Sequence, residues 1–199
     1  MLKVYLLRHG ETTFNADNNR YCGRTDAALT HRGIEQAKEV ARLVKGIRFD
    51  AVYSSPLTRA YQTAQIASGG LPVEKVEKLI EADFGDWEGK TRAEFVAENP
   101  KLWERWCDDP DHTPAGGRGE TGLEVAERVE HFFQELQEKY PSGTVMVVAH
   151  NGVNRLFLAR KLGMPLKNYR RIVQENSSIT IIELGGPEGF FLSKLNSRG

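Results

Sequence analysis

Three apolar runs, far apart along the chain, have the character of buried strands. Residues 3–7, 51–54 and 144–149 are mostly apolar and include β-branched or aromatic side chains. The segments between them place apolar residues at alternating spacings of three and four, which is typical of helices with one buried face. Strands that alternate with helices predict an α/β fold with a mainly parallel central sheet.

Capping residues predict where the flanking helices begin. Thr30 precedes one apolar stripe, and Ser55 with Pro56 precedes a second. Thr121 and Glu124 form a capping box before a third. We therefore expect helices to start at these three points and to cover the sheet.

The remaining segments suggest how the domain is organised. Residues 178–184 and 190–195 flank a glycine pair and predict a closing pair of strands. Residues 82–120 mix acids, aromatics, prolines and glycines without a clean period. A length of 199 residues suits one domain. We expect a single domain over 1–199 that carries a helical and loop insertion at about 82–120, near the functional site.

Charge and cysteine content exclude several classes of partner. Basic and acidic residues number 27 each, so no bulk field would hold nucleic acid or a membrane surface. No apolar run approaches the ~20 residues of a membrane span, and the N-terminus has no signal-peptide pattern. Cys22 and Cys107 form no CxxC pair; free thiols are expected, with one disulfide as the alternative. We expect a cytoplasmic protein that binds neither nucleic acid nor membranes.

Basic side chains stand where the three strands end. Arg8 and His9 follow the first strand, His150 follows the third, and Arg59 lies in the first turn of the helix after the second. Ligands of open parallel sheets bind beyond the carboxyl ends of the strands, so these residues are expected to meet in one pocket. Each could be an ordinary surface residue, but their arrival from three parts of the chain favours a shared site. Guanidinium groups match phosphate oxygens two at a time, so the pocket suits a phosphate-like anion.

Other common chemistries lack their motifs. Two fixed guanidinium groups would repel a divalent metal, and neither HExxH nor paired His/Cys spacing occurs, so no metal site is predicted. There is no P-loop, and Ser54 and Ser55 lack the glycines of a serine-hydrolase elbow.

Four motifs follow one another along nearly the whole chain. They are Arg8-His9-Gly10-Glu11-Thr12 with Asn15, Ser54-Ser55-Pro56-Leu57-Thr58-Arg59-Ala60, Glu81 with Phe84-Gly85-Asp86-Trp87-Glu88-Gly89, and Val148-Ala149-His150-Asn151-Gly152. In this order they resemble the histidine phosphatase superfamily, in its phosphoglycerate-mutase-like branch. The resemblance implies a three-layer sandwich, in which helices flank a mainly parallel sheet with one antiparallel edge strand.

The resemblance also implies a phosphohistidine mechanism. His9 would attack phosphorus, which splits the transfer into two easier steps. Arg8, Arg59 and His150 would hold the phosphoryl oxygens, so no metal or other cofactor is expected. Glu81 would protonate the leaving oxygen and then take a proton from water.

Several assigned residues have a structural alternative. Glu81 could be a solvated loop carboxylate, and Glu88 is the rival for the acid. Asn15 would donate a hydrogen bond to the phosphoryl group, or it could be a plain turn or helix residue. The resemblance adds Cys22, Gly23 and Asn151 to the substrate-binding residues. Substrate choice is expected in residues 20–24 and 103–120, where Trp103 and Trp106 either stack on a substrate or belong to the core.

The family contains several activities. Its dedicated mutases are longer, so this chain resembles the shorter phosphatases, and among them the α-ribazole phosphatases of cobalamin assembly. Phosphoserine phosphatases of the family are near as well, but no histidine follows His150 here to match their tail histidine. The expected substrate is a small-molecule phosphate ester, and the expected state is monomer or homodimer. Mutase-type phosphoryl transfer and a silent phospho-ligand-binding domain are the alternatives.

Overall fold

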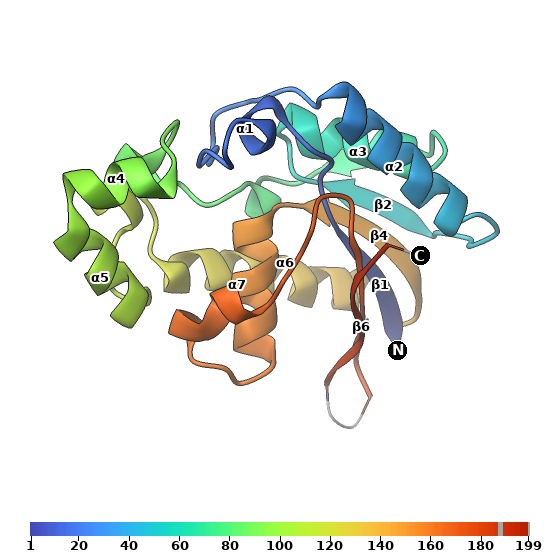
Figure 1. The fold of residues 1–199 in the computed structure, drawn as a ribbon. Helices are drawn as coiled ribbons and strands as arrows, with labels where there is room; N and C mark the ends of the chain where they lie inside the picture. The colour runs from blue at the N-terminus through green and yellow to red at the C-terminus, as the bar shows by residue number, and fades with distance from the viewer. Residues whose placement is uncertain (187–188, 199) are drawn as a thin grey trace.

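A six-stranded sheet in the order β3-β2-β4-β1-β5-β6 forms the centre of the protein (Figure 1). The structure is a computed structural model that describes residues 1–186 and 189–198. The strands are β1 (Leu2–Arg8), β2 (Ala51–Ser54), β3 (Val73–Lys75), β4 (Gly143–Ala149), β5 (Ile179–Leu184) and β6 (Phe190–Ser197). Strands β1 to β4 are mutually parallel, which confirms the mainly parallel sheet. β5 runs antiparallel to β1, but it is not the edge strand, because β6 pairs antiparallel with its other side.

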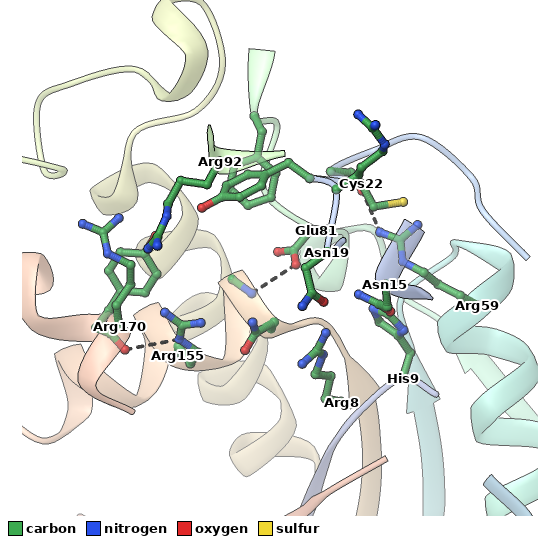
Figure 2. A pocket seen from close by; sticks show the side chains of 17 residues that line it. Arg8, His9, Asn15, Asn19, Cys22, Arg59, Glu81, Arg92, Arg155 and Arg170 are labelled. Atoms are coloured by element: carbon green, nitrogen blue, oxygen red, sulfur yellow. Dashed lines mark hydrogen bonds between the residues drawn. The ribbon is translucent and has the colours of Figure 1, made fainter. Parts of the chain in front are cut away.

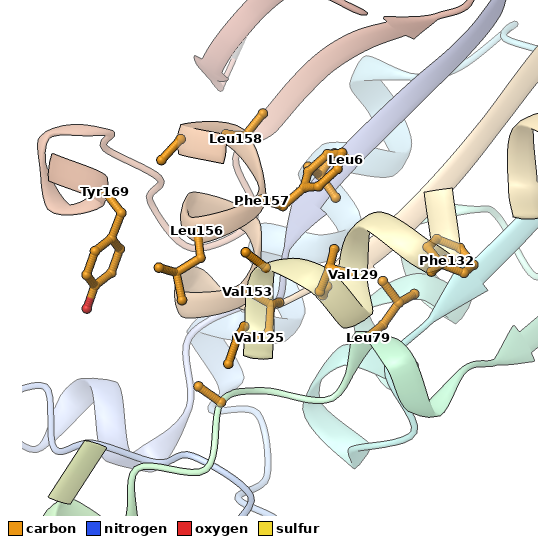
Figure 3. Close-up of a cluster of buried hydrophobic side chains, with 14 of the residues drawn as sticks. Leu6, Leu79, Val125, Val129, Phe132, Val153, Leu156, Phe157, Leu158 and Tyr169 are labelled. Atoms are coloured by element: carbon orange, nitrogen blue, oxygen red, sulfur yellow. The ribbon is translucent and has the colours of Figure 1, made fainter. Parts of the chain in front are cut away.

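Helices cover both faces of the sheet, so the protein has three layers, as expected (Figure 1). α2 (His31–Leu43) and α3 (Thr58–Ala67) lie on one face; α6 (Gly122–Lys139) and α7 (Asn151–Lys161) lie on the other. Alternate residues of β1 serve the two layers. Leu6 belongs to the larger cluster with Phe157 of α7 (Figure 3), and Leu7 belongs to the smaller cluster with Ala60 of α3. β1 therefore contributes to the hydrophobic core on both faces of the sheet.

The observed caps agree with the sequence for two helices and differ for the third. Thr30 accepts from the Gly33 amide, and Thr121 forms the expected capping box at α6. α3 begins later than Ser55 and Pro56 suggest, with Leu57 at the cap position and no cap bond from the Leu57 side chain. The side chain of Asp26 instead accepts from the Thr58 amide (2.9 Å) and hydroxyl (2.7 Å). A carboxylate from a distant loop thus replaces the local cap.

Residues 82–120 contain four short helices beside the sheet layers (Figure 1). These are η2 (Gly85–Trp87), α4 (Arg92–Glu98), α5 (Pro100–Asp108) and η3 (Ala115–Gly117). Aromatic packing holds them: Trp87 stacks on Phe95 at 4.7 Å and meets the edges of Trp103 and Trp106 at 5.7 Å each. The two tryptophans of α5 therefore belong to this packing.

The remaining helices are α1 (Thr13–Ala16), η1 (Glu77–Leu79) and η4 (Leu166–Arg171). Within the described residues no helix has the length and apolar character needed to cross a membrane. Cys22 and Cys107 are both free thiols.

Candidate active site

The parallel pairing of β1 with β4 brings the predicted residues together. Their register sets Arg8 opposite Ala149, so His9 and His150 leave the sheet side by side. The two ring centroids are 5.1 Å apart. Arg59, in the first turn of α3, donates from Nε to Nδ1 of His150 (3.2 Å). The structure thus assembles one cluster from three distant segments.

A cavity of about 430 Å³ opens at this edge of the sheet (Figure 2). Eight residues of the predicted set line it: Arg8, His9, Asn15, Cys22, Gly23, Arg59, Glu81 and Asn151. The ninth, His150, is fully buried and lies behind this lining, against His9 and Arg59.

One hydrogen bond fixes the tautomer of His9. Its Nδ1 lies 2.7 Å from the Gly10 carbonyl oxygen. A carbonyl can only accept, so Nδ1 carries the proton and Nε2 keeps its lone pair. Burial, with the charges of Arg59 and Arg8, lowers the pKa of His9 well below its usual value. His9 is therefore a neutral imidazole near pH 7, with one ring nitrogen free to attack an electrophile.

His150 is held in the opposite tautomer. The Arg59 guanidinium can only donate, so Nδ1 of His150 accepts and Nε2 carries the proton. That Nε2–H is buried and has no hydrogen-bond partner among the described residues. Burial, followed by the charges of Arg59 and His9, lowers the pKa of His150 well below its usual value. A neutral His150 thus has an unpaired Nε2–H donor beside His9, and an oxygen of a bound anion there would accept its hydrogen bond.

Backbone carbonyls of one loop hold Arg59. Its Nη2 donates to the Gly23 carbonyl (2.6 Å) and its Nη1 to the Thr25 carbonyl (2.8 Å). Glu88 fixes that loop: its carboxylate accepts from the amides of Arg24 (2.9 Å) and Thr25 (3.1 Å) and from the Thr25 hydroxyl (2.7 Å). These three hydrogen bonds occupy the Glu88 carboxylate, so Glu88 is a poor candidate for the general acid.

Arg8 has both a fixed and a free side. Its Nη1 donates to the Gln174 carbonyl (2.8 Å), and its buried Nε has no partner within the described part of the chain. Burial is the main cause that lowers the pKa of Arg8, to about 10. The guanidinium remains charged near neutrality and keeps donors for an anion.

Glu81 sits at the N-terminus of α7. Its carboxylate accepts from the backbone amides of Ala82 (2.9 Å), Gly152 (3.0 Å) and Val153 (3.1 Å). A Cβ at position 152 would lie 2.6 Å from Oε1 of Glu81, so any larger residue there would displace the carboxylate. Glu81 as a residue is 6% exposed and lines the cavity, so it is not the solvated loop carboxylate of the alternative interpretation.

Asn15 is oriented by donors on its carbonyl side. Its Oδ1 accepts from the Thr12 amide (3.1 Å) and from Nδ2 of Asn176 (3.1 Å). Asn15 thus has the helix role of the alternative interpretation, because it forms the capping box of α1, and it also lines the cavity. With Oδ1 occupied, its NH₂ group is left for a ligand.

The sequence analysis assigned no role to the residues that support this cluster. Asn176 donates to the His9 carbonyl (3.1 Å) as well as to Asn15. The Thr63 hydroxyl accepts from the Gly10 amide (3.0 Å) and donates to the Arg59 carbonyl (2.7 Å). Thr63 stands one helical turn after Arg59 on α3, a spacing that could have suggested its position.

The far part of the cavity comes mostly from residues that the sequence did not single out. Its lining includes Tyr21, Phe84, Arg92, Arg155, Tyr169 and Arg170. Of the two segments expected to govern substrate choice, 20–24 contributes to the lining, and 103–120 contributes none of the described lining residues. α7 and η4 take its place.

In the described part of the chain no group of three or more His, Cys, Asp or Glu side chains is arranged to hold a metal ion. The cavity is instead surrounded by guanidinium groups, which attract anions.

Comparison with known proteins agrees with this geometry. The family model described as histidine phosphatase superfamily (branch 1) matches residues 4–198. The adenosylcobalamin/alpha-ribazole phosphatase of Escherichia coli (strain K12) is 38% identical over 167 residues, which cover 82% of this chain and 81% of that protein. Phosphoserine phosphatase 1 of Hydrogenobacter thermophilus is 34% identical over 186 residues, which cover 92% and 87%.

A solved structure matches over the full length. It is a phosphoserine phosphatase mutant from Entamoeba histolytica in complex with phosphoserine, with a TM-score of 0.91 and 31% identity. The match covers 100% of this chain and 98% of that one.

Proposed function

The chain belongs to the histidine phosphatase superfamily (branch 1) and is a hydrolase of phosphoric monoesters, and we propose that it acts through a phosphohistidine formed on His9. The observation that carries this proposal is the pair of opposite tautomers. A ring nitrogen with a free lone pair lies beside an unsatisfied N–H of His150, and the guanidinium groups of Arg8 and Arg59 adjoin both. Phosphoryl transfer needs this combination of a nucleophile and donors for the phosphoryl oxygens.

In the first half of the proposed reaction, Nε2 of His9 attacks phosphorus and the bond from phosphorus to the ester oxygen breaks. Glu81 gives its proton to the departing oxygen, so that an alcohol leaves. Nδ1–H of His9 remains bonded to the Gly10 carbonyl, which offsets the positive charge that the ring acquires. Arg8, Arg59, His150 and Asn15 stabilise the charge on the phosphoryl oxygens.

In the second half, water attacks the phosphohistidine. Glu81 takes a proton from that water, the N–P bond breaks, and inorganic phosphate leaves. The cycle returns Glu81 to its protonated form and His9 to its starting tautomer. Side-chain cations supply the charge stabilisation that a metal would supply elsewhere, so we propose that no metal is required.

Two measurements test the proposal. Hydrolysis of para-nitrophenyl phosphate should continue in the presence of EDTA, and rapid denaturation during turnover should trap an acid-labile, base-stable phosphoenzyme. Sensitivity to EDTA would contradict metal independence. Turnover without any phosphoenzyme would contradict the covalent route, and binding of phosphate esters without turnover would support the silent-domain alternative.

The names of the relatives suggest two candidate substrates, α-ribazole 5′-phosphate and phosphoserine, and different parts of the cavity suit each of them. α-Ribazole 5′-phosphate carries a flat base, which could stack on the aromatic lining formed by Tyr21, Phe84 and Tyr169. Phosphoserine carries a carboxylate, for which Arg155 and Arg170 are suitable partners. A comparison of kcat/KM for these two esters and 3-phosphoglycerate distinguishes them. Migration of phosphate within 3-phosphoglycerate, in place of its release, would support the mutase alternative.

A further inference from the structure

Positive charge is concentrated in the cavity far beyond its share in the chain. The sequence has zero net charge, yet the described lining contains six arginines and a single carboxylate, Glu81. The cluster around His9 accounts for Arg8 and Arg59 only. Arg92 of α4, Arg155 of α7 and Arg170 of η4 therefore form a second group, which we call the arginine end.

The guanidinium groups of Arg155 and Arg170 are positioned by aromatic neighbours. Both lie against the Tyr169 ring, at 4.9 and 5.2 Å from its centroid, and Arg170 also stacks on Trp103 at 4.5 Å. Nε of Arg155 donates to the Tyr169 carbonyl (3.3 Å), and Nη2 of Arg170 donates to Sγ of Cys107 (2.9 Å). Neither side chain needs a ligand to be held in place, so both are preorganised.

No carboxylate neutralises the arginine end. Within the described residues, Arg92, Arg155 and Arg170 have no acidic oxygen within 4 Å, and Nη1 of Arg170 is buried without a hydrogen-bond partner. Arg20 offers a contrast in the same lining, because Asp17 (2.6 Å) and Glu94 (2.7 Å) pair with it. A half-buried guanidinium with an unsatisfied donor costs free energy, which an anionic partner would recover.

The arginine end is separate from the place where the phosphoryl group would be transferred. Figure 2 shows Arg155 and Arg170 on one side of the cavity and His9 and Arg59 on the other, with Glu81 between them. Glu81 is the proposed proton donor to the leaving oxygen. The part of the substrate that leaves therefore extends toward the arginine end.

We infer that Arg155 and Arg170, with Arg92 at the rim, form a second anion-binding subsite, and that the substrate is a phosphate monoester whose leaving group carries a carboxylate or a second phosphate. This inference rests on the proposed function, because that function sets which end holds the transferred group. α-Ribazole 5′-phosphate has no second anion and leaves the subsite empty. Phosphoserine and 3-phosphoglycerate belong to the favoured class.

A matched series of synthetic esters tests the subsite. ω-Carboxyalkyl phosphates of increasing chain length are compared with their neutral carboxamides, and alkanediol bisphosphates with the corresponding monophosphates. We expect kcat/KM to favour the anionic member by about 10- to 100-fold at one optimal length, as for one or two charge-assisted hydrogen bonds. The better of the two series identifies whether the second anion is a carboxylate or a phosphate.

Variants test whether Arg155 and Arg170 cause the preference for the acid over its amide. Arg155→Gln and Arg170→Gln should each reduce the ratio of kcat/KM between the acid and its amide by about tenfold or more. Arg171→Gln is the matched control, since Arg171 is exposed and outside the described lining, and it should keep the wild-type ratio. Thermal unfolding of each variant verifies folding. A wild-type ratio near one at every length, or a ratio that survives in both variants, overturns the inference.

A binding measurement separates this inference from the proposed function. The non-hydrolysable phosphonate analogues of the same acid and amide are titrated calorimetrically against the wild-type protein and the three variants. Turnover without a preference for the acid contradicts the subsite alone. A preference for the acid phosphonate without turnover of any ester supports the subsite and contradicts the proposed hydrolysis.

Discussion

The two ends of the cavity are built from different parts of the fold. Around His9 and His150 the basic groups stand at a strand end or in the first turn of the following helix. Backbone carbonyls hold Arg8, His9 and Arg59, and Arg59 in turn holds His150. The arginine end comes from α4, α7 and η4, and the guanidinium groups of Arg155 and Arg170 lie against aromatic rings. Sheet register is hard to alter, whereas helices and loops tolerate change. The first end therefore suits an invariant reaction, and the second suits the choice of substrate.

The largest effect is expected from His9→Ala, which should abolish the chemistry at the first end of the cavity and leave anion binding at the second end intact. His9→Ala removes the proposed nucleophile, so turnover should fall by at least about a thousandfold and the trapped phosphoenzyme should disappear. Binding of an anionic phosphonate should persist, because Arg155 and Arg170 are untouched. Steady-state kinetics measure turnover, labelling after a quench in alkaline detergent measures the phosphoenzyme, and calorimetric titration measures phosphonate binding. His131→Ala, at an exposed position, is the control; residual activity of His9→Ala above about 1% would mean another nucleophile.

Glu81→Gln is expected to produce the next largest effect. It tests whether Glu81, which lies between the two ends of the cavity, donates the proton to the leaving oxygen. The variant cannot protonate the leaving oxygen, so alkyl phosphates should lose about a hundredfold or more in kcat, while para-nitrophenyl phosphate, whose leaving group needs little protonation, should lose much less. Stopped-flow kinetics of both esters give the ratio. Equal losses on the two esters would remove Glu81 from the role of proton donor.

The pH dependence of stability should also distinguish the ends. The pKa values of His9 and His150 are lowered in the folded protein, so the unfolded chain binds more protons below its ordinary histidine pKa of about 6.5. Stability should therefore fall as the pH drops below about 6.5, by up to about 2 kcal/mol for each histidine at pH 5. Urea unfolding between pH 8 and 5 measures this slope.

Two variants test whether the buried histidines cause the pH dependence of the unfolding free energy. His150→Gln should remove part of it, because glutamine does not titrate, and Arg170→Gln should leave it as in the wild type. Inorganic phosphate should bind more tightly as the pH falls through the same range, since a bound anion favours protonated histidines. A slope that is equal in His150→Gln and in the wild type would contradict the assignment.

The sequence predicted one end of the cavity much better than the other, for a physical reason. Arg8, His9 and His150 follow continuous apolar runs whose β-branched and aromatic residues indicate buried strands, and parallel strands bring their ends to one edge. Their position thus follows from local pattern and one topological rule. The order of the sheet was not available in this way, and β6 lies outside β5 because of pairing that no single strand encodes.

Long-range packing determined what the sequence could not show. Arg155 lies in the second turn of α7 and Arg170 in a short helix, and neither follows a strand or belongs to a motif. Their convergence depends on how η4 packs against α5, which places Tyr169 and Trp103 beside them. The hydrogen bonds by which Asp26 caps α3 and Glu88 holds the loop at Arg24 also join side chains to distant segments. Such contacts carry no periodic signal.

Glu88→Gln is expected to give the smallest effect, because it acts on the first end indirectly. Glutamine has one acceptor oxygen for three donors, so the loop from Gly23 to Thr25 should loosen and Arg59 should lose part of its support. We expect a loss of about three- to tenfold in kcat/KM that is the same for acid and amide substrates, since the arginine end is unchanged. Asp86→Asn, which removes an exposed ion pair with Arg118 in the same segment, is the matched control and should change kcat/KM little. A selective loss on the acid substrate would mean that the loop also shapes the arginine end, and the division between the two ends would then fail.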